Sequence, residues 1–336
     1  MVQTTSSRAP HRRPAGGRSV LHRVVALAAA TASAAALAWP DQPITLLVPY
    51  TPGTGVDAVA RQLAARLPSA LGQPVVVENV VGASGTIGTE RVARAKPDGH
   101  TLLVQSQAFV MSRSLYRGLA FDPMTDFAPV SLAGWGSLVL LVPATPGAPR
   151  TLAEFIAAAT ASPGKLTYAT PGVGTPHHLA STVFLQKTGL NLLHVPYKGT
   201  TGAVADLLGG RVDCMFLPIN VALPHIQSGK VVALATGSLR RLPQLPQVPT
   251  LAELKVDVGS LDVWYGVLAP KGTPAATIDR LNHEIAAALA TPALAAAFEA
   301  QGIVPMASTP AEFGRLLADE NVRWTAVVER AGIRGE

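Results

Sequence analysis

Two glycine-rich turns constrain the fold of this chain more than any other feature, because each follows an apolar strand candidate and leads into a helix candidate. The first turn covers residues 51–55 and the second covers residues 170–175. A helix that starts directly after such a turn leaves backbone N–H groups unpaired, and the helix dipole places partial positive charge there. One such unit in each half of the chain predicts two jaws that close on an anionic ligand.

Each turn also has a purely structural explanation, since glycine supplies positive φ in ordinary strand-to-helix turns. Asp57 lies in the first turn of the helix that follows residues 51–55, where the helix dipole favours a carboxylate. It would repel an anionic ligand unless it orients the loop amides or meets an amino group of the ligand.

Strand and helix candidates alternate along the chain, which predicts an α/β fold with largely parallel sheets. The strand candidates are continuous apolar runs, as expected where both faces of a sheet are covered. They lie at residues 44–49, 75–78, 101–105, 138–142, 166–169, 192–195, 212–216, 232–236 and 263–269. The helix candidates lie at residues 56–70, 85–94, 151–162, 177–188, 202–208, 275–290, 292–300 and 310–331. Thr309 and Glu312 resemble a capping box at the start of the last helix.

The N-terminus is typical of a secretory signal peptide. Residues 1–38 contain five arginines and no acid, and their apolar run ends in Ala36-Leu37-Ala38, a small-x-small cleavage site. An uncleaved anchor is the alternative, but the run is short for a membrane span. Without these arginines, 22 of the 27 basic residues remain against 21 acids, so the net charge of +6 gives no indication of a nucleic-acid partner. We therefore expect a periplasmic protein that starts at Trp39.

Three further segments are candidates for the same ligand site. Gln105, Ser106 and Gln107 follow a strand candidate, and polar residues at the carboxyl ends of parallel strands bind ligands in α/β folds. Residues 80–88 lack the glycine order of a dinucleotide fingerprint, which favours a helix-start turn beside the cleft. Lys198 either neutralises an anion or is a solvated loop residue.

Signals for catalysis, metals and cofactors are missing from the sequence. It has no G-x-S-x-G elbow, no Walker A loop, no H-E-x-x-H motif and no cysteine pair. Cys214 is the only cysteine, so no internal disulfide is possible, and its apolar surroundings predict a buried thiol. His177 and His178 are adjacent and would point in different directions on a helix, which disfavours a shared metal. We predict neither a cofactor nor a metal.

The ordered set of segments resembles the Bug-type extracytoplasmic solute receptors of tripartite tricarboxylate transporters. The matching segments are residues 39–44, 48–57, 71–79, 82–85, 97–102, 126–130, 168–179, 194–199, 206–210 and 223–226. The resemblance implies a type II periplasmic-binding-protein fold, in which two α/β lobes joined by hinge strands enclose a ligand cleft. It places residues 1–38 in the signal peptide, residues 39–142 plus 265–336 in one lobe and residues 143–264 in the other.

The resemblance also implies which residues face the ligand. From one lobe these are Tyr50, Thr51, Gly53, Thr54, Gly55, Asp57, Gln105, Ser106 and Gln107, and from the other Thr170, Gly172, Gly174, Thr175, His178 and Tyr197. Two positions depart from the family pattern. Thr54 stands where a second glycine is common, and Leu217 stands where aspartate is frequent. If Leu217 lines the cleft, its apolar side chain favours a ligand without an amino group.

The function implied is that of a receptor without catalytic activity. It would capture a small organic carboxylate, either a dicarboxylate or an aromatic acid, as a monomer and deliver it to membrane transporter subunits. One alternative is a sensor whose closed form engages a sensor kinase. Another is a secreted hydrolase, for which Ser106 and His178 are the best available pair.

Overall fold

The described residues of the computed structural model are 1–2, 39–116 and 118–334. They form a short N-terminal unit, Met1–Asp41, and a body, Gln42–Glu336. The predicted signal peptide lies almost entirely outside the described residues. Within the described ranges, no helix is both long enough and apolar enough to cross a membrane.

One sheet of the body combines parallel and antiparallel strands. Its order is β10-β4-β9-β3-β1-β2. The strands are β1 (Ile44–Val48), β2 (Val75–Asn79), β3 (Thr101–Gln105), β4 (Phe127–Pro143), β9 (Asp262–Pro270) and β10 (Val304–Pro305). β1 pairs in parallel with β2 and β3, whereas β9 pairs antiparallel with both β3 and β4.

Strand β4 belongs to two sheet regions. Its first part pairs with β9 as far as Ser137, opposite Asp262, and residues 138–143 pair antiparallel with β7 (Met215–Pro218) and β8 (Val231–Thr236). Strands β5 (Thr167–Thr170) and β6 (Leu193–Pro196) pair in parallel and form a separate two-stranded sheet. Three of the eight strand pairs among the described residues are parallel, so the expectation of largely parallel sheets is wrong. The reason is that β4 and β9 run antiparallel to each other and to each of the other strands with which they pair.

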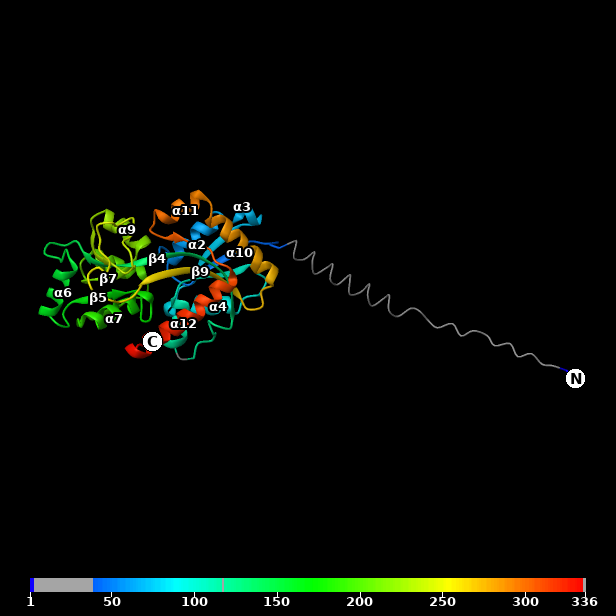
Figure 1. The fold of residues 1–336 in the computed structure, drawn as a ribbon, viewed down its shortest axis with the longest axis horizontal. Helices are drawn as coiled ribbons and strands as arrows, with labels where there is room; N and C mark the ends of the chain where they lie inside the picture. The colour runs from blue at the N-terminus through cyan, green and yellow to red at the C-terminus, as the bar shows by residue number, and fades with distance from the viewer. Residues whose placement is uncertain (3–38, 117, 335–336) are drawn as a thin grey trace. The chain divides into compact units, whose positions relative to one another are not determined.

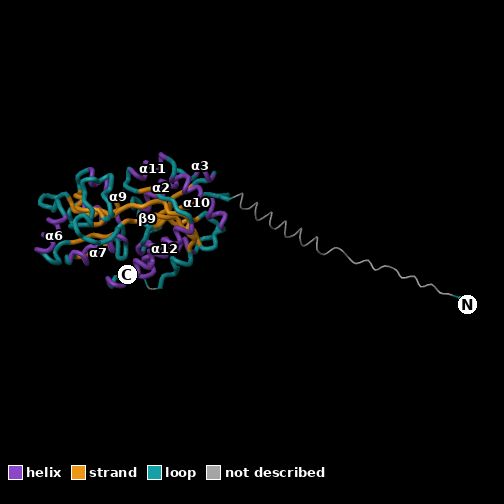
Figure 2. Tube along the Cα trace, in the orientation of Figure 1, coloured by secondary structure: helices purple, strands orange, loops and turns teal. Residues whose placement is uncertain are grey.

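The helices gather around these two sheet regions (Figure 1). We call the part built on β1, β2, β3 and β10 the first lobe; its helices are α2 (Gly55–Ala64), α3 (Pro68–Leu71), η1 (Ala83–Gly85), α4 (Thr86–Ala93), α5 (Ala108–Leu115), α10 (Ala275–Leu289), α11 (Pro292–Glu299) and α12 (Pro310–Ala331). The part built on β5–β8 is the second lobe, with α6 (Leu152–Ala161), α7 (Pro176–Thr188), α8 (Thr200–Leu208) and α9 (Ile219–Gln227). Figures 1 and 2 show β4 and β9 running between the two lobes.

Threonine starts five of the helices. The hydroxyl oxygens of Thr54, Thr151, Thr175, Thr291 and Thr309 accept hydrogen bonds from backbone N–H groups in the first turns of α2, α6, α7, α11 and α12. Each replaces water at an otherwise unpaired donor, which typically stabilises a helix start by about 1 kcal/mol. The capping box of Thr309 and Glu312 is confirmed, with Pro310 at the first helical position.

Each lobe has its own hydrophobic core. In the first lobe, Phe109, Trp264 and Phe313 lie in a cluster between the sheet and helices α5 and α12. In the second lobe, the cluster includes Met215 and Leu217 of β7. Leu217 is fully buried there. It therefore packs in the core rather than lining a cleft, and the inference that it favours a ligand without an amino group loses its basis.

Candidate functional site

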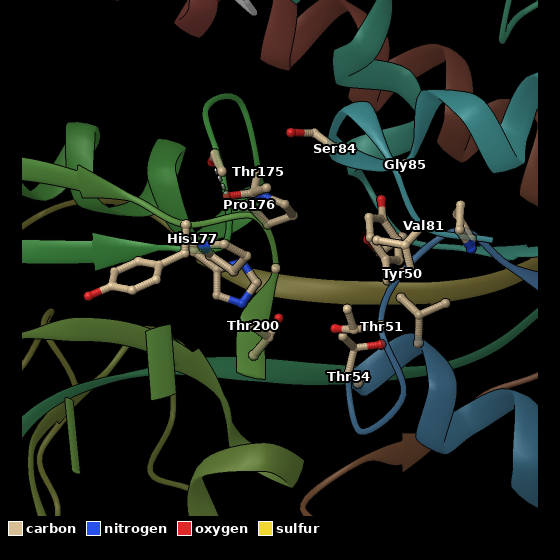
Figure 3. Close-up of a pocket in the computed structure, with 18 of the residues that line it drawn as sticks. Tyr50, Thr51, Thr54, Val81, Ser84, Gly85, Thr175, Pro176, His177 and Thr200 are labelled. Atoms are coloured by element: carbon tan, nitrogen blue, oxygen red, sulfur yellow. Dashed lines mark hydrogen bonds between the residues drawn. The ribbon is translucent and has the colours of Figure 1, made fainter. Parts of the chain in front are cut away.

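A cavity of about 630 Å³ lies between the two lobes. Both glycine turns contribute to its walls, and Val263 and Tyr265 of the connecting strand β9 contribute as well. The volume falls in the usual range of small-molecule sites. Figure 3 shows Thr51, Thr54 and Tyr50 on one side and Thr175, Pro176 and His177 on the other.

Six helices begin at or next to this cavity. The lining residues at or just before their starts are Gly55 for α2, Gly85 for α4, Ser106 for α5, Pro176 for α7, Thr200 for α8 and Pro218 for α9. Helix N-termini carry unpaired N–H groups and partial positive charge. Among the described residues that line the cavity, the only charged side chain is Lys198, which is exposed. Backbone dipoles, with no carboxylate opposing them in the wall, therefore make this cavity suitable for an anion.

Asp57 lies outside the cavity lining and stabilises the first turn through hydrogen bonds. We call Asp57 and its partners the charged brace. Asp57 Oδ2 accepts a 2.9 Å hydrogen bond from the backbone N–H of Gly53 and another from Arg61 Nε, while Oδ1 accepts from Asn79 Nδ2 at 2.9 Å. Burial alone would raise the pKa of Asp57, but the hydrogen bonds from Arg61, Gly53 and Asn79 outweigh burial and hold this pKa below its usual value. Asp57 therefore orients the turn, and its charge is neutralised away from the cavity.

The second turn is held from behind by neutral aromatic groups. His178 Nδ1 accepts a 3.1 Å hydrogen bond from the backbone N–H of Gly174, so the proton of this ring is assigned to Nε2. The ring stacks on His194 at 4.3 Å between centroids, and His194 stacks in turn on Tyr168 at 4.7 Å. Burial, together with the neighbouring His194, lowers the pKa of His178 to about 4. A 2.7 Å hydrogen bond also joins Thr170 Oγ1 to His194 Nε2. We call His178, His194, Tyr168 and Thr170 the neutral brace of the second turn.

The two jaws touch at the rim of the cavity. The carbonyl oxygen of Val173 accepts hydrogen bonds of 3.4 Å from Ser84 Oγ and from the hydroxyl of Tyr116. Glycine makes this approach possible, since a Cβ at Gly172 would lie 2.9 Å from Ser84 Oγ and a Cβ at Gly174 would collide with Leu115. At the other end, the hydroxyl of Tyr265 donates to Asn220 Oδ1 at 3.5 Å.

The predicted site residues divide into two groups. Those that line the cavity are Tyr50, Thr51, Thr54, Gly55, Ser106, Gly172, Thr175 and Tyr197. Those that lie outside its lining are Gly53, Asp57, Gln105, Gln107, Thr170, Gly174 and His178. Several of the second group contact the first: Gln105 Oε1 accepts a 2.9 Å hydrogen bond from the hydroxyl of Tyr50. Gln107 Nε2 instead donates to the backbone oxygen of Asp262 at 3.2 Å, at the start of β9.

Sequence reasoning missed several lining residues. The structure adds His177, Tyr116, Thr200 and Tyr265, and it places residues 81–85 in the wall as the expected helix-start turn. Ala83 and Ser84 have φ values of 43° and 50°, which present the Ser84 side chain toward the second turn (Figure 3). The signal for His177 was its place at the start of α7, but a sequence does not show which of two adjacent histidines faces inward.

The arrangement favours binding over chemistry. His178 Nδ1 is occupied by Gly174, and no hydrogen bond joins His178 to Ser106 among the described residues, so the pair considered for hydrolysis is not assembled. In the described part of the chain, no group of three or more His, Cys, Asp or Glu residues is placed to hold a metal ion. Cys214 is buried, and burial raises the pKa of its thiol well above the usual range.

Comparison with known proteins agrees with this geometry. Residues 59–333 match the family described as "Tripartite tricarboxylate transporter family receptor". Protein BugT of Bordetella pertussis is 38% identical over 94% of this chain and 97% of its own length. The solved structure of the periplasmic binding protein BugD is 34% identical with a TM-score of 0.83, covering 89% of this chain and 100% of that one.

A further solved structure, R. palustris Rpa4515 with adipate, is 33% identical with a TM-score of 0.85, covering 88% of this chain and 99% of that one. These matches confirm the two-lobe periplasmic-binding-protein fold, with a mixed sheet in the first lobe. The family consists of solute-binding receptors, not enzymes. The chain belongs to the tripartite tricarboxylate transporter receptor family and is a solute-binding receptor of the Bug type.

Proposed function

We propose that this receptor works in the periplasm, captures a small organic carboxylate in the cavity between its lobes, and delivers it to a tripartite tricarboxylate-type membrane transporter. The observation that carries the proposal is the convergence of six helix starts on a cavity without an acidic side chain in its described walls. The adipate held by the related R. palustris protein supports a carboxylate, and a dicarboxylate or an aromatic acid would suit the volume.

The ligand contacts follow from the division of the site residues. We assign direct contact to the lining group, above all to Thr51, whose buried hydroxyl has no hydrogen-bond partner among the described residues. A buried hydroxyl without a partner is costly, and a carboxylate oxygen would satisfy it. We assign to Asp57, Gln105, Thr170 and His178 the task of holding the two turns in shape.

The lobes and the mature terminus are part of the same proposal. We place one lobe in residues 39–142 plus 265–336 and the other in residues 143–264, with β4 and β9 as hinge strands. Export would remove residues 1–38. N-terminal sequencing of protein recovered from the periplasm should give Trp39 as the first residue, and an intact N-terminus on exported protein would contradict this part.

Ligand binding is tested by titration calorimetry on protein that starts at Trp39. The protein is first unfolded and refolded to remove any retained ligand, and then titrated with monocarboxylates, dicarboxylates, aromatic acids and amino acids. We expect binding of at least one class of carboxylate. Thr51→Val should weaken that binding roughly tenfold, because a hydrogen bond to a charged group contributes about 1.5–3 kcal/mol.

Thr145→Val is the matched control, since Thr145 is exposed and lies outside the cavity lining. If Thr51→Val and Thr145→Val bind the carboxylate with equal affinity, the ligand does not depend on the Thr51 hydroxyl of the first turn. Refolded protein that binds no carboxylate would overturn the proposed ligand class. Delivery is tested separately, by reconstituting transport with the partner transporter and asking whether uptake depends on the receptor.

A further inference from the structure

His177 is the most unusual polar group of the cavity. It is the second residue of α7, and its ring lies across the cavity from Tyr50, Thr51 and Thr54 (Figure 3). Both ring nitrogens are buried, and neither has a hydrogen-bond partner among the described residues. His178, the next residue, has its Nδ1 satisfied by the N–H of Gly174. Of the two adjacent histidines, one braces the turn and the other presents unused polar atoms to the ligand space.

The surroundings keep the His177 ring neutral. Burial lowers its pKa to about 4, and no charged group offsets that effect. The titratable groups that line the cavity with it are Tyr50, Tyr116, Tyr197, Tyr265 and the exposed Lys198. Burial, together with the hydrogen bond to Asp206, raises the pKa of Tyr197 to about 12, and burial raises the pKa of Tyr50 and Tyr265 still further. Asp206 itself lies behind Tyr197 and pairs with Arg211.

A neutral imidazole offers one N–H donor and one acceptor nitrogen. A carboxylate placed against the ring accepts from the N–H and adds a negative charge within a few ångströms, which favours the protonated ring. The proton then comes from bulk solvent and is bound by the free ring nitrogen, so that a neutral histidine, a proton and a carboxylate become an imidazolium–carboxylate pair. A ligand without an acidic group at this end leaves the ring neutral.

We propose that His177 recognises a second acidic group of the ligand, opposite the group held by the first glycine turn, and takes up a proton from solvent when that group binds. This inference rests on the proposed function. It makes His177 a specificity-determining residue, because ligands with and without the second acidic group differ in their contact with this ring. It also makes affinity for such ligands rise as pH falls, since binding consumes a proton.

The test compares adipate with hexanoate, which has the same chain length and lacks the second carboxylate. Titration calorimetry at pH 6 in two buffers of different ionisation enthalpy gives the number of protons bound with each acid. We expect adipate to take up roughly one proton, hexanoate to take up almost none, and adipate affinity to rise severalfold from pH 8 to pH 6.

Two variants test whether the proton uptake on adipate binding comes from His177. His177→Gln should abolish proton uptake and weaken adipate binding by about tenfold, while hexanoate binding changes much less. His283→Gln is the matched control, because His283 is exposed on α10, outside the cavity lining. Circular dichroism establishes that the variants fold; if His177→Gln does not, the comparison of adipate with hexanoate on the unaltered protein still decides.

The outcomes separate the inference from the proposed function. Binding of adipate without proton uptake, or with the same uptake in His177→Gln, overturns the role of His177 and leaves the carboxylate receptor intact. Failure of every carboxylate in the earlier panel to bind overturns the proposed function and this inference together. Tight binding of hexanoate and none of adipate overturns this inference and leaves the proposed carboxylate receptor intact.

Discussion

The two glycine turns have the same outline and are held in opposite ways. The first depends on a charge, the carboxylate of Asp57, which is bonded to Gly53, Arg61 and Asn79. The second depends on neutral rings, with His178 stacked on His194 and bonded to Gly174. Both braces aim backbone groups at one cavity, but acid should act on them at different pH values. The braces therefore offer a way to disturb one jaw without the other.

The largest effect should come from the charged brace. Asp57→Ala leaves the Gly53 N–H, Asn79 and Arg61 without their shared acceptor, and we expect a loss of about 3 kcal/mol in the free energy of unfolding, measured by urea denaturation. Ligand affinity should fall as well, because the turn loses its shape. Asp279→Ala, at an exposed position of α10, serves as the control. Similar free energies of unfolding for Asp57→Ala and Asp279→Ala would show that the first turn keeps its shape without Asp57.

The next effect is that of pH on His178 of the neutral brace and on its neighbour His177. An unfolded histidine binds a proton near pH 6.5, whereas burial lowers the pKa of both His177 and His178 to about 4 in the folded protein. Between these values the unfolded state binds more protons, so stability falls as pH is lowered through this window, by about 1–2 kcal/mol per histidine at pH 5. The contribution of Asp57, whose pKa is lowered by folding, persists until the pH falls below about 3.9.

The variant His178→Phe tests the second turn alone, again by urea denaturation. We expect the variant to be about 1 kcal/mol less stable at pH 7, because Gly174 loses its acceptor, and to lose less stability between pH 7 and pH 5. Urea denaturation at several pH values checks both expectations. If the free energy of unfolding depends on pH in the same way in the variant and in the unaltered protein, His178 does not contribute to acid sensitivity.

The smallest effect is expected where the jaws touch. Ser84 Oγ reaches the Val173 oxygen at 3.4 Å in a partly exposed position, so Ser84→Ala should change ligand affinity by less than about threefold in titration calorimetry. A tenfold loss would mean that Ser84 contacts the ligand itself rather than only the opposite jaw. That result would add the helix-start turn of residues 82–85 to the recognition surface.

Local patterns in the sequence predicted the elements well and their pairing less well. Every strand candidate overlaps an observed strand, because apolar runs between glycine and proline are local signals. The first half of β4 and helices α5 and α9 are not predicted. Residues 127–137 mix glycine, proline and serine with apolar residues and gain their strand conformation from pairing with β9. Direction of pairing depends on chain crossings that no local pattern records.

The site shows the same limit at the scale of single side chains. The glycine turns were legible because their role is local, whereas Thr54 and Thr175 were predicted as ligand contacts and their capping of α2 and α7 was not predicted. Which of His177 and His178 lines the cavity depends on how α7 is rotated against its neighbours, and the buried position of Leu217 depends on the core of the second lobe. Roles that depend on tertiary rotation are not encoded in residue spacing.

Strand β9 supplies part of the cavity wall through Val263 and Tyr265, and it is also one of the two strands that connect the lobes. With β4 and β9 as the proposed hinge strands, bending between the lobes would have its axis beside the cavity wall near Tyr265. Displacement grows with distance from such an axis, so we expect the wall near Tyr265 to keep nearly the same shape and the rim at Ser84 and Val173 to move more. Under the proposed function, we expect the end of a ligand near Tyr265 to meet an already formed surface, and its other end to be covered only when the lobes close.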